Sequence, residues 1–238
     1  KGVVMGVSVV AMGGRVGRGR SLTSALAAAG CTDPAVLRAM SRVPRQDFLA
    51  EELREEAYLE RSLPIGEGQR IAAPSLVART LQLLSLGPQD KLLEIGTGSG
   101  YSAAVASHLA RDVYTVERNA NLARAASCFL GRLGYRNIHV RHGEGVDGWA
   151  EHGPFDAISV TFPAPSLIRP LVQQLTLGGK LVMAMGHSGI NDALLLVTRT
   201  VDGFVENSVL GARPGPSIAP YPLAAGSQQA TPYPRSCA

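Results

Sequence analysis

The sequence contains few cysteines, few aromatic residues and no apolar run long enough to cross a membrane. Its 238 residues include three cysteines, Cys31, Cys128 and Cys237, which are far apart and odd in number. This distribution argues against a disulfide framework, and without a Cys-x-x-Cys pair the usual signature of a zinc site is missing. We therefore expect reduced thiols and a cytoplasmic protein. We expect no membrane partner, because a membrane span needs about 20 apolar residues.

The sequence also has only a small excess of charge of one sign. Lysine and arginine number 23 against 19 acidic residues, which gives a formal net charge of +4, and only 5% of residues are aromatic. A nucleic-acid surface typically combines a basic stripe with aromatic side chains, so we expect no nucleic-acid partner and interpret the charge as a solubility feature. His139 and His142 have only Glu144 as a further candidate ligand, so we expect no metal.

Several common signatures are absent. Without a G-x-S-x-G elbow the chain does not match the usual serine hydrolases, and without a Gly-Lys-Ser/Thr after its glycines it does not match a P-loop nucleotidase. Residues 2–14 are mildly apolar, but arginines follow them, which reverses the order found in a signal peptide. We expect residues 1–20 to form a poorly ordered leader.

The first third of the chain predicts helices around one loop. We expect helices over residues 21–49, 51–59 and 74–86, and a loop over residues 63–68. Asp33 and Pro34 have the order of a helix cap followed by a first-turn proline, although Pro44 interrupts the pattern later. The loop is predicted from its proline and glycines. Residues 21–90 are thus expected to form a helical region that also supplies a substrate loop.

Beyond residue 90, short apolar runs alternate with helical segments. The expected strands cover residues 91–95, 112–116, 138–141, 155–161 and 180–185, with helices over 101–109, 120–133 and 166–175. Such alternation predicts an α/β fold with a Rossmann-like, doubly wound and mostly parallel sheet. Residues 194–200 and 204–210 predict a C-terminal antiparallel pair. We expect this core to span residues 91–211, preceded by the N-terminal helical extension, and an extended tail over residues 212–238.

A glycine-rich turn between a strand and a helix carries the strongest chemical signal. The turn reads Gly96-Thr97-Gly98-Ser99-Gly100, and Glu117 ends the next strand 21 positions after Gly96. Alternate glycines let the backbone approach a ligand closely. An acid about 20 residues after such a turn is typical of a ribose-binding carboxylate, which accepts hydrogen bonds from both hydroxyls.

The details of this turn distinguish two kinds of cofactor. A dinucleotide dehydrogenase has the spacing GxGxxG, whereas this chain has GxGxG with Glu94 just before it. A carboxylate at that position repels a pyrophosphate and attracts a cationic amino-acid group. The sequence therefore favours S-adenosyl-L-methionine over a nicotinamide dinucleotide.

Residues from about 42 to 186 resemble the protein-L-isoaspartate O-methyltransferases, which are class I S-adenosylmethionine-dependent methyltransferases. The stretches that carry the resemblance include Val43-Pro44-Arg45, Leu63-Pro64-Ile65-Gly66, Glu94 to Tyr101, Tyr114 to Arg118, Pro154-Phe155-Asp156 and Gly178-Gly179. They cover well over half of the chain. The string before the glycine turn is more specific than the turn itself, which many methyltransferases share.

The resemblance implies a set of cofactor-binding residues in a methyltransferase core. These are Glu94, Gly96, Thr97, Gly98, Ser99, Gly100, Tyr101, Glu117, Arg118, Gly143, Glu144 and Thr161. The family has Gly-Asp-Gly where this chain has Gly143-Glu144-Gly145, so we expect Glu144 to keep a place near the adenine. Thr161 is expected to end its strand near the reacting methyl group.

One loop departs from the family pattern. The family reads Gly-x-x-Ile-Ser-x-Pro there, and this chain places Ala72 at the position of the serine often assigned as the active-site residue. Arg70 replaces a small polar residue, commonly threonine. Alanine donates no hydrogen bond to a carboxylate, whereas arginine offers two in parallel. We therefore expect Arg70, Ile71 and Ala73 to contact the substrate, and we leave the role of Ala72 open.

The resemblance implies methylation of the carboxylate of L-isoaspartyl residues, the first step in repair of damaged proteins. The expected partners are proteins or peptides that contain isoaspartate, and we expect a monomer. Two alternatives follow from Ala72, Arg70 and the unusual Phe162-Pro163. In the first alternative, the same chemistry is directed at another carboxylate or peptide acceptor. In the second, the chain binds the cofactor without turnover.

Overall fold

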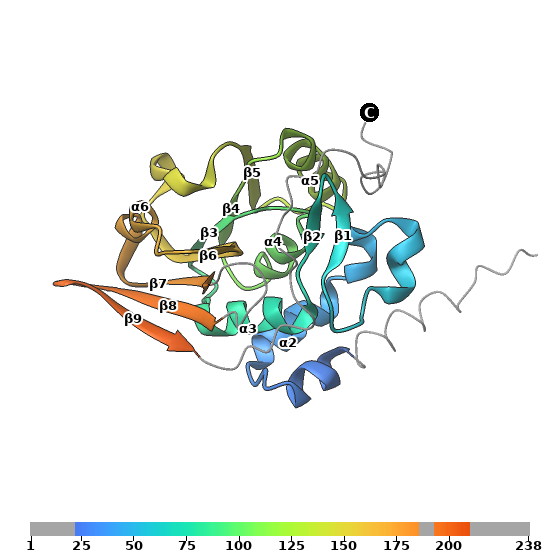
Figure 1. Cartoon of the computed structure of the whole chain (residues 1–238), viewed down its shortest axis with the longest axis horizontal. Helices are drawn as coiled ribbons and strands as arrows, with labels where there is room; N and C mark the ends of the chain where they lie inside the picture. Colours follow the sequence, from blue (N-terminus) through green and yellow to red (C-terminus); the bar gives the residue numbers. More distant parts are fainter. Residues whose placement is uncertain (1–21, 186–192, 210–238) are drawn as a thin grey trace, which may run out of the picture.

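The computed structural model describes residues 22–185 and 193–209 (Figure 1). Its main sheet has seven strands in the order β5-β4-β3-β6-β7-β8-β9. The parallel strands are β3 (Lys91–Ile95), β4 (Asp112–Glu117), β5 (Ile138–His142), β6 (Phe155–Ala164) and β7 (Leu175–Met185). An antiparallel pair follows, β8 (Ala193–Thr200) and β9 (Gly203–Val209). The expected fold class is confirmed. The leader and the tail of residues 212–238 lie outside the described residues.

Helices cover both faces of the sheet, because its central strands are apolar on both sides. Leu92 packs into one cluster and its neighbour Leu93 into the other, as the alternation of side chains along a strand requires. The first cluster includes residues of α2 (Pro34–Arg42), α3 (Pro74–Leu84), α4 (Tyr101–Ala106) and α5 (Ala120–Arg132). The second cluster packs under α6 (Arg169–Gln173).

The N-terminal region is less regular than the sequence predicts. The helix expected over residues 21–49 is broken into a helical stretch at residues 22–28, α2 and a 3-10 turn, η1 (Arg45–Phe48). Asp33 caps α2 as expected, and its Oδ1 accepts from Ala35 N at 2.7 Å. The acidic stretch from residue 51 forms only a short 3-10 helix, η2 (Glu51–Glu56).

The loop expected over residues 63–68 is wrong. This segment forms a two-stranded antiparallel sheet of β1 (Leu63–Gly66) and β2 (Gln69–Ile71), which Figure 1 shows beside α4 and α5. Leu63, Ile65 and Ile71 are buried and give the hairpin an apolar side. Pro64 is tolerated because a two-stranded sheet consists only of edge strands.

The end of the core also differs from expectation. The helix expected over residues 166–175 is limited to α6, and β7 begins at Leu175. Phe155 N donates to Gln174 O at 2.7 Å, and Phe155 then pairs with Leu175, so the start of β6 draws these residues into the sheet. The antiparallel pair β8–β9 is confirmed close to its predicted bounds.

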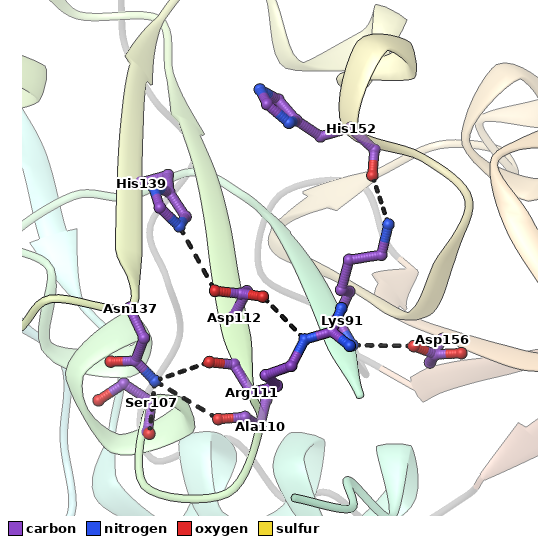
Figure 2. A network of polar contacts seen from close by, with 9 residues as sticks. All are labelled: Lys91, Ser107, Ala110, Arg111, Asp112, Asn137, His139, His152 and Asp156. Carbon is purple, nitrogen blue, oxygen red and sulfur yellow. Dashed lines mark hydrogen bonds and ion pairs between the residues drawn. The ribbon is translucent and has the colours of Figure 1, made fainter. Parts of the chain in front are cut away.

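A polar network closes the sheet at the amino ends of its strands (Figure 2). Asp112 lies between Arg111, whose Nε donates at 2.9 Å, and His139, whose Nε2 is at 3.6 Å. Burial raises the pKa of Asp112, but the hydrogen bonds and charges of Arg111 and His139 outweigh it and lower the pKa below its usual value. Nearby, Lys91 N donates to Asp156 Oδ2 at 2.8 Å. This network lies opposite the carboxyl ends of the strands and fixes the sheet at that edge.

Cys31 is a free and buried thiol, in agreement with the expectation of reduced thiols at this position. Among the described helices, none is both long and apolar enough to span a bilayer.

Candidate active site

A cavity of about 560 Å³ lies at the carboxyl ends of β3, β4 and β6 and is closed on another side by the β1–β2 hairpin. This is the edge at which ligands bind in open α/β sheets, and the volume is typical of a small-molecule site. Most of the predicted site residues line it. They are Arg70, Ile71, Ala72, Gly96, Thr97, Gly98, Ser99, Tyr101, Glu117, Arg118, Glu144 and Thr161.

The glycine turn packs so closely against β6 that a larger side chain at Gly96 has no room. Gly96 has φ 98°, and a Cβ there lies only 2.3 Å from Thr161 Oγ1. That hydroxyl is within hydrogen-bond distance of two carbonyl oxygens, Ile95 O at 3.0 Å and Gly96 O at 2.9 Å. Thr161 therefore joins β6 to the turn, and glycine is required at position 96. The expectation that Thr161 ends its strand is wrong, because β6 continues to Ala164.

Glu117 is fixed with both carboxylate oxygens oriented by backbone amides. Gly98 N donates to Oε2 at 2.9 Å and Asn119 N donates to Oε1 at 2.9 Å. The side chain is 8% exposed and lines the cavity. Such a preorganised carboxylate loses little rotamer freedom when it accepts further hydrogen bonds from a diol.

Glu94 is fully buried directly behind the glycine turn. Thr115 Oγ1 donates to its Oε2 at 2.8 Å, and Thr115 Oγ1 also lies 2.7 Å from Thr97 Oγ1. The other oxygen, Oε1, has no hydrogen-bond partner within the described part of the chain. Burial raises the pKa of Glu94 to about 7, against smaller opposing contributions from the hydroxyls of Ser102 and Thr115. An acid in this state ionises readily when a cation arrives.

The loop that departs from the family pattern forms the opposite wall. Ala72 lines the cavity, and its carbonyl oxygen accepts from Arg45 Nη1 at 2.5 Å. Arg70 is exposed at this wall, where its Nε donates to Ser62 Oγ at 3.0 Å and its Nη2 to Ser62 O at 2.8 Å. Two of the five guanidinium N–H groups are thereby used, and no ion pair joins Arg70 to a described carboxylate. The loop presents a tethered cation and no hydroxyl.

Four predicted site residues are not part of the cavity wall, namely Ala73, Glu94, Gly100 and Gly143. Three of these residues support other residues that do line the cavity. Ala73 precedes α3, Gly100 adopts φ 83° before α4, and Gly143 N donates to Glu117 O at 3.0 Å. Tyr101 lines the wall, but its hydroxyl contacts Met40 Sδ at 3.7 Å in the core.

Sequence reasoning missed part of the cavity wall. The missed residues come from the hairpin, α3, β6 and β7–β8, and include Ser62, Leu76, Val77, Thr80, Ser159, Ala184 and Leu194. Ser159 is a serine inside an apolar strand, a signal that was available. Its hydroxyl is buried and has no partner among the described residues. The others gave no signal, because their places depend on how α3 and β8 pack against the sheet.

Comparison with known proteins agrees with this geometry. A sequence profile described as Protein-L-isoaspartate(D-aspartate) O-methyltransferase matches residues 18–212. The chain belongs to the protein-L-isoaspartate O-methyltransferase family. Protein-L-isoaspartate O-methyltransferase 1 of Geotalea uraniireducens is 51% identical over 73% of this chain and 80% of its own length. Protein-L-isoaspartate O-methyltransferase 2 of Pelobacter propionicus is 46% identical over 77% of this chain and 82% of its own length.

Solved structures of the protein-L-isoaspartate O-methyltransferase family share the fold. One is 26% identical, with a TM-score of 0.73 over 82% of this chain, which spans 64% of that protein. Another, a putative member from Plasmodium falciparum in complex with S-adenosyl-L-homocysteine, is 24% identical with a TM-score of 0.69, over 81% of this chain and 94% of its own length. Both likenesses extend beyond the sheet to the N-terminal region, because they cover about four fifths of the chain.

Proposed function

We propose that this protein transfers the methyl group of S-adenosyl-L-methionine to the carboxylate of L-isoaspartyl residues in proteins and peptides. The observation that carries the proposal is the cavity itself. The glycine turn and Glu117 line this cavity of about 560 Å³ together with residues of the loop 70–73, which we call the acceptor loop. The chain is also a member of the family. Family membership favours isoaspartyl acceptors over the alternatives.

The residues present fit the cofactor. Glu117 is oriented to accept both ribose hydroxyls, and four residues of the glycine turn, Gly96, Thr97, Gly98 and Ser99, line the cavity beside it. The unpartnered Glu94 Oε1 suits the ammonium of the methionine part, with Glu94 acting from just behind the turn. Glu144 is exposed at the far end of the wall and is assigned to the adenine. When bound, the cofactor supplies a methyl group on a good leaving group.

On the acceptor side, positioning is the main task. A carboxylate is already ionised near neutral pH, so no base is needed. Arg70 orients one acceptor oxygen through its free N–H groups, while Ile71, Ala72 and Ala73 shape the loop around it. The methyl transfer is accelerated because the protein holds the acceptor oxygen in line with the methyl group and excludes water. The missing hydroxyl at Ala72 is therefore expected to slow the reaction rather than abolish it.

The product ester accounts for repair. The backbone nitrogen that follows the isoaspartyl residue attacks the methyl ester, methanol leaves and a succinimide forms. Hydrolysis of this ring gives partly normal aspartate and partly isoaspartate, which re-enters the cycle. In this scheme the protein performs only the methyl transfer.

The alanine at position 72 leaves two alternative hypotheses to be tested. One is the same chemistry on another carboxylate or peptide acceptor, which Phe162 and Pro163 in the cavity wall favour because they reshape it. The other is a cofactor-binding protein without turnover. We also propose a monomeric cytoplasmic protein, with residues 21–90 supplying the acceptor loop and residues 91–211 the cofactor site.

The decisive experiment is a tritiated-methyl transfer assay with a peptide that contains L-isoaspartate and its normal-aspartate twin. Base-labile label on the isoaspartyl peptide alone is the expected result. Calorimetric titration with S-adenosylhomocysteine runs beside it, and Ala72→Ser serves as the matched variant with the family residue, expected to be faster. Cofactor-product binding without transfer to either peptide contradicts the repair function.

A further inference from the structure

The β1–β2 hairpin reaches over the cofactor end of the cavity as well as its acceptor end. Ile65 Cδ1 lies 3.2 Å from the position of a Cβ built on Gly98, so the hairpin packs directly on the glycine turn. Gln69 and Arg70 line the same cavity as Gly98 and Glu117. A ligand seated on the glycine turn is therefore enclosed by an element that is not part of the main sheet.

The tip of this hairpin is an unfavourable place for a glutamate. Glu67 has φ 53° and Gly68 has φ 68°, so both residues of the two-residue turn lie in the left-handed region. Such turns favour asparagine, aspartate and glycine at the first position, and a longer side chain there costs about 1 kcal/mol. A glutamate at this position suggests a use for its longer side chain.

The Glu67 carboxylate reaches the start of α5. Asn119 Nδ2 donates to its Oε2 at 3.0 Å, and Asn121 Nδ2 donates to its Oε1 at 3.2 Å. Asn119 is the cap of α5, with its Oδ1 accepting from Asn121 N at 2.9 Å. The positive end of this helix favours a carboxylate at the same point.

The hairpin is thus anchored to the junction that also orients the ribose acid. Asn119 binds Glu67 through its side chain and Glu117 through its backbone N–H, at 2.9 Å. Opening the hairpin breaks the contacts of Glu67 and uncovers the glycine turn, whereas Glu117 keeps its own partners.

We propose that Glu67 is a latch that holds the β1–β2 hairpin closed over the bound cofactor and slows release of S-adenosylhomocysteine. This is a positioning role, since Glu67 does not line the cavity. It rests on the cofactor site proposed above. Lid opening of this kind frequently limits product release.

The test measures S-adenosylhomocysteine dissociation by stopped flow. Glu67→Asn removes the latch while relieving the turn, so the dissociation rate is expected to rise about tenfold, the equivalent of one to two hydrogen bonds, without a lower unfolding temperature. Asn121→Ala is expected to give a smaller rise, and the double variant to add little to Glu67→Asn. Glu206→Gln, an exposed acid on β9, is the charge control.

The outcomes separate this proposal from the one it rests on. Failure of the unaltered protein to bind S-adenosylhomocysteine refutes the cofactor site. Normal binding with a dissociation rate in Glu67→Asn within twofold of the unaltered protein refutes the latch alone. A lower unfolding temperature together with faster release identifies Glu67 as a merely structural residue and also overturns the proposal.

Discussion

Glu94 illustrates at the scale of one residue how burial prepares a group for a ligand. Its carboxyl is enclosed behind the glycine turn with one oxygen unpartnered. Burial raises its pKa from 4.5 to about 7, so near neutral pH it is half protonated in the free protein. On the proposed assignment the ammonium of the cofactor favours the ionised form, so we expect cofactor binding to release a proton.

We therefore expect the affinity for S-adenosylhomocysteine to depend on pH. Below pH 7 the ligand must first displace the proton, so the Kd at pH 6 is expected to be about tenfold higher than at pH 8. Isothermal titration calorimetry at the two pH values measures this. Glu94→Gln is the control, with weaker but pH-independent binding. A Kd of the unaltered protein that is constant between pH 6 and pH 8 contradicts the assignment.

The stability of the free protein is expected to change with pH in the opposite direction. Because the folded-state pKa is about 7 and the ordinary value is 4.5, the folded protein holds more protons than the unfolded chain between these values. The contribution of Glu94 to stability is thus lost as pH rises from about 4.5 to 7. Urea unfolding at pH 5 and pH 7.5 tests this, and Glu94→Gln is expected to show a smaller difference. An equal difference in the two proteins assigns the effect to other groups.

Arg70 is the residue at which acceptor binding is best tested. Its guanidinium has free N–H groups at the cavity wall and no carboxylate partner among the described residues. Arg70→Thr, which restores a common family residue, is expected to raise the KM for the isoaspartyl peptide about tenfold, as expected for a lost charge-assisted hydrogen bond, and to leave the Kd of S-adenosylhomocysteine unchanged. Steady-state kinetics and calorimetry measure the two effects. An unchanged peptide KM indicates that Arg70 points to solvent during turnover.

Arg45 holds several elements together around the acceptor loop. It is fully buried, and its guanidinium donates to the carbonyl oxygens of Ala57, Arg61 and Ala72. Burial lowers its pKa to about 10, which leaves it charged at neutral pH. The side chain thus joins the end of η2, the start of the hairpin and the acceptor loop.

Removal of this group is expected to be costly. Arg45→Met removes the donor from one buried and two part-buried carbonyl groups and is expected to lower the free energy of unfolding by about 3 kcal/mol, measured by urea denaturation. The peptide KM is expected to rise as the loop loosens. Arg54→Met, at an exposed site on η2, is the control and is expected to change stability by less than about 0.5 kcal/mol. Similar stability for both variants contradicts this role.

At the scale of the whole molecule, the C-terminal strand pair belongs to the core rather than to an appendage. Figure 1 shows β8 and β9 extending the sheet beyond β7. Leu194 and Leu195 of β8 are buried in different clusters, so β8 contributes to both faces of the sheet. By contrast, Val205 on β9 is 50% exposed.

This arrangement predicts a contrast between the two strands. Leu195→Ala is expected to destabilise the protein by 2 to 5 kcal/mol, roughly the usual cost of emptying a core position, and to lower the m-value little. Val205→Ala is expected to cost less than about 1 kcal/mol, because half of that side chain is already in solvent. Thermal and urea unfolding measure both. A small effect of Leu195→Ala means that the pair folds independently of the core.

Features that depend on local chemistry can be predicted from the amino-acid sequence alone. The α/β alternation predicts the parallel strands, because each apolar run is short and followed by a helical segment. The spacing from Gly96 to Glu117 predicts the ribose acid, because a strand, a helix and a second strand separate them by a nearly fixed length. The cap of α2 at Asp33 and the alanine at position 72, where the family has a serine, are likewise visible in single residues.

Features that depend on contacts between distant residues follow from the three-dimensional packing and could not be predicted from the sequence. The β1–β2 hairpin forms because Leu63, Ile65 and Ile71 find a core to pack against, which outweighs a composition typical of loops. The link from Glu67 to Asn119 joins residues 52 positions apart. The raised pKa of Glu94 arises from burial behind the glycine turn, which no neighbour in the sequence reveals. Such properties arise from the packing of elements, so they become readable only once the chain has folded.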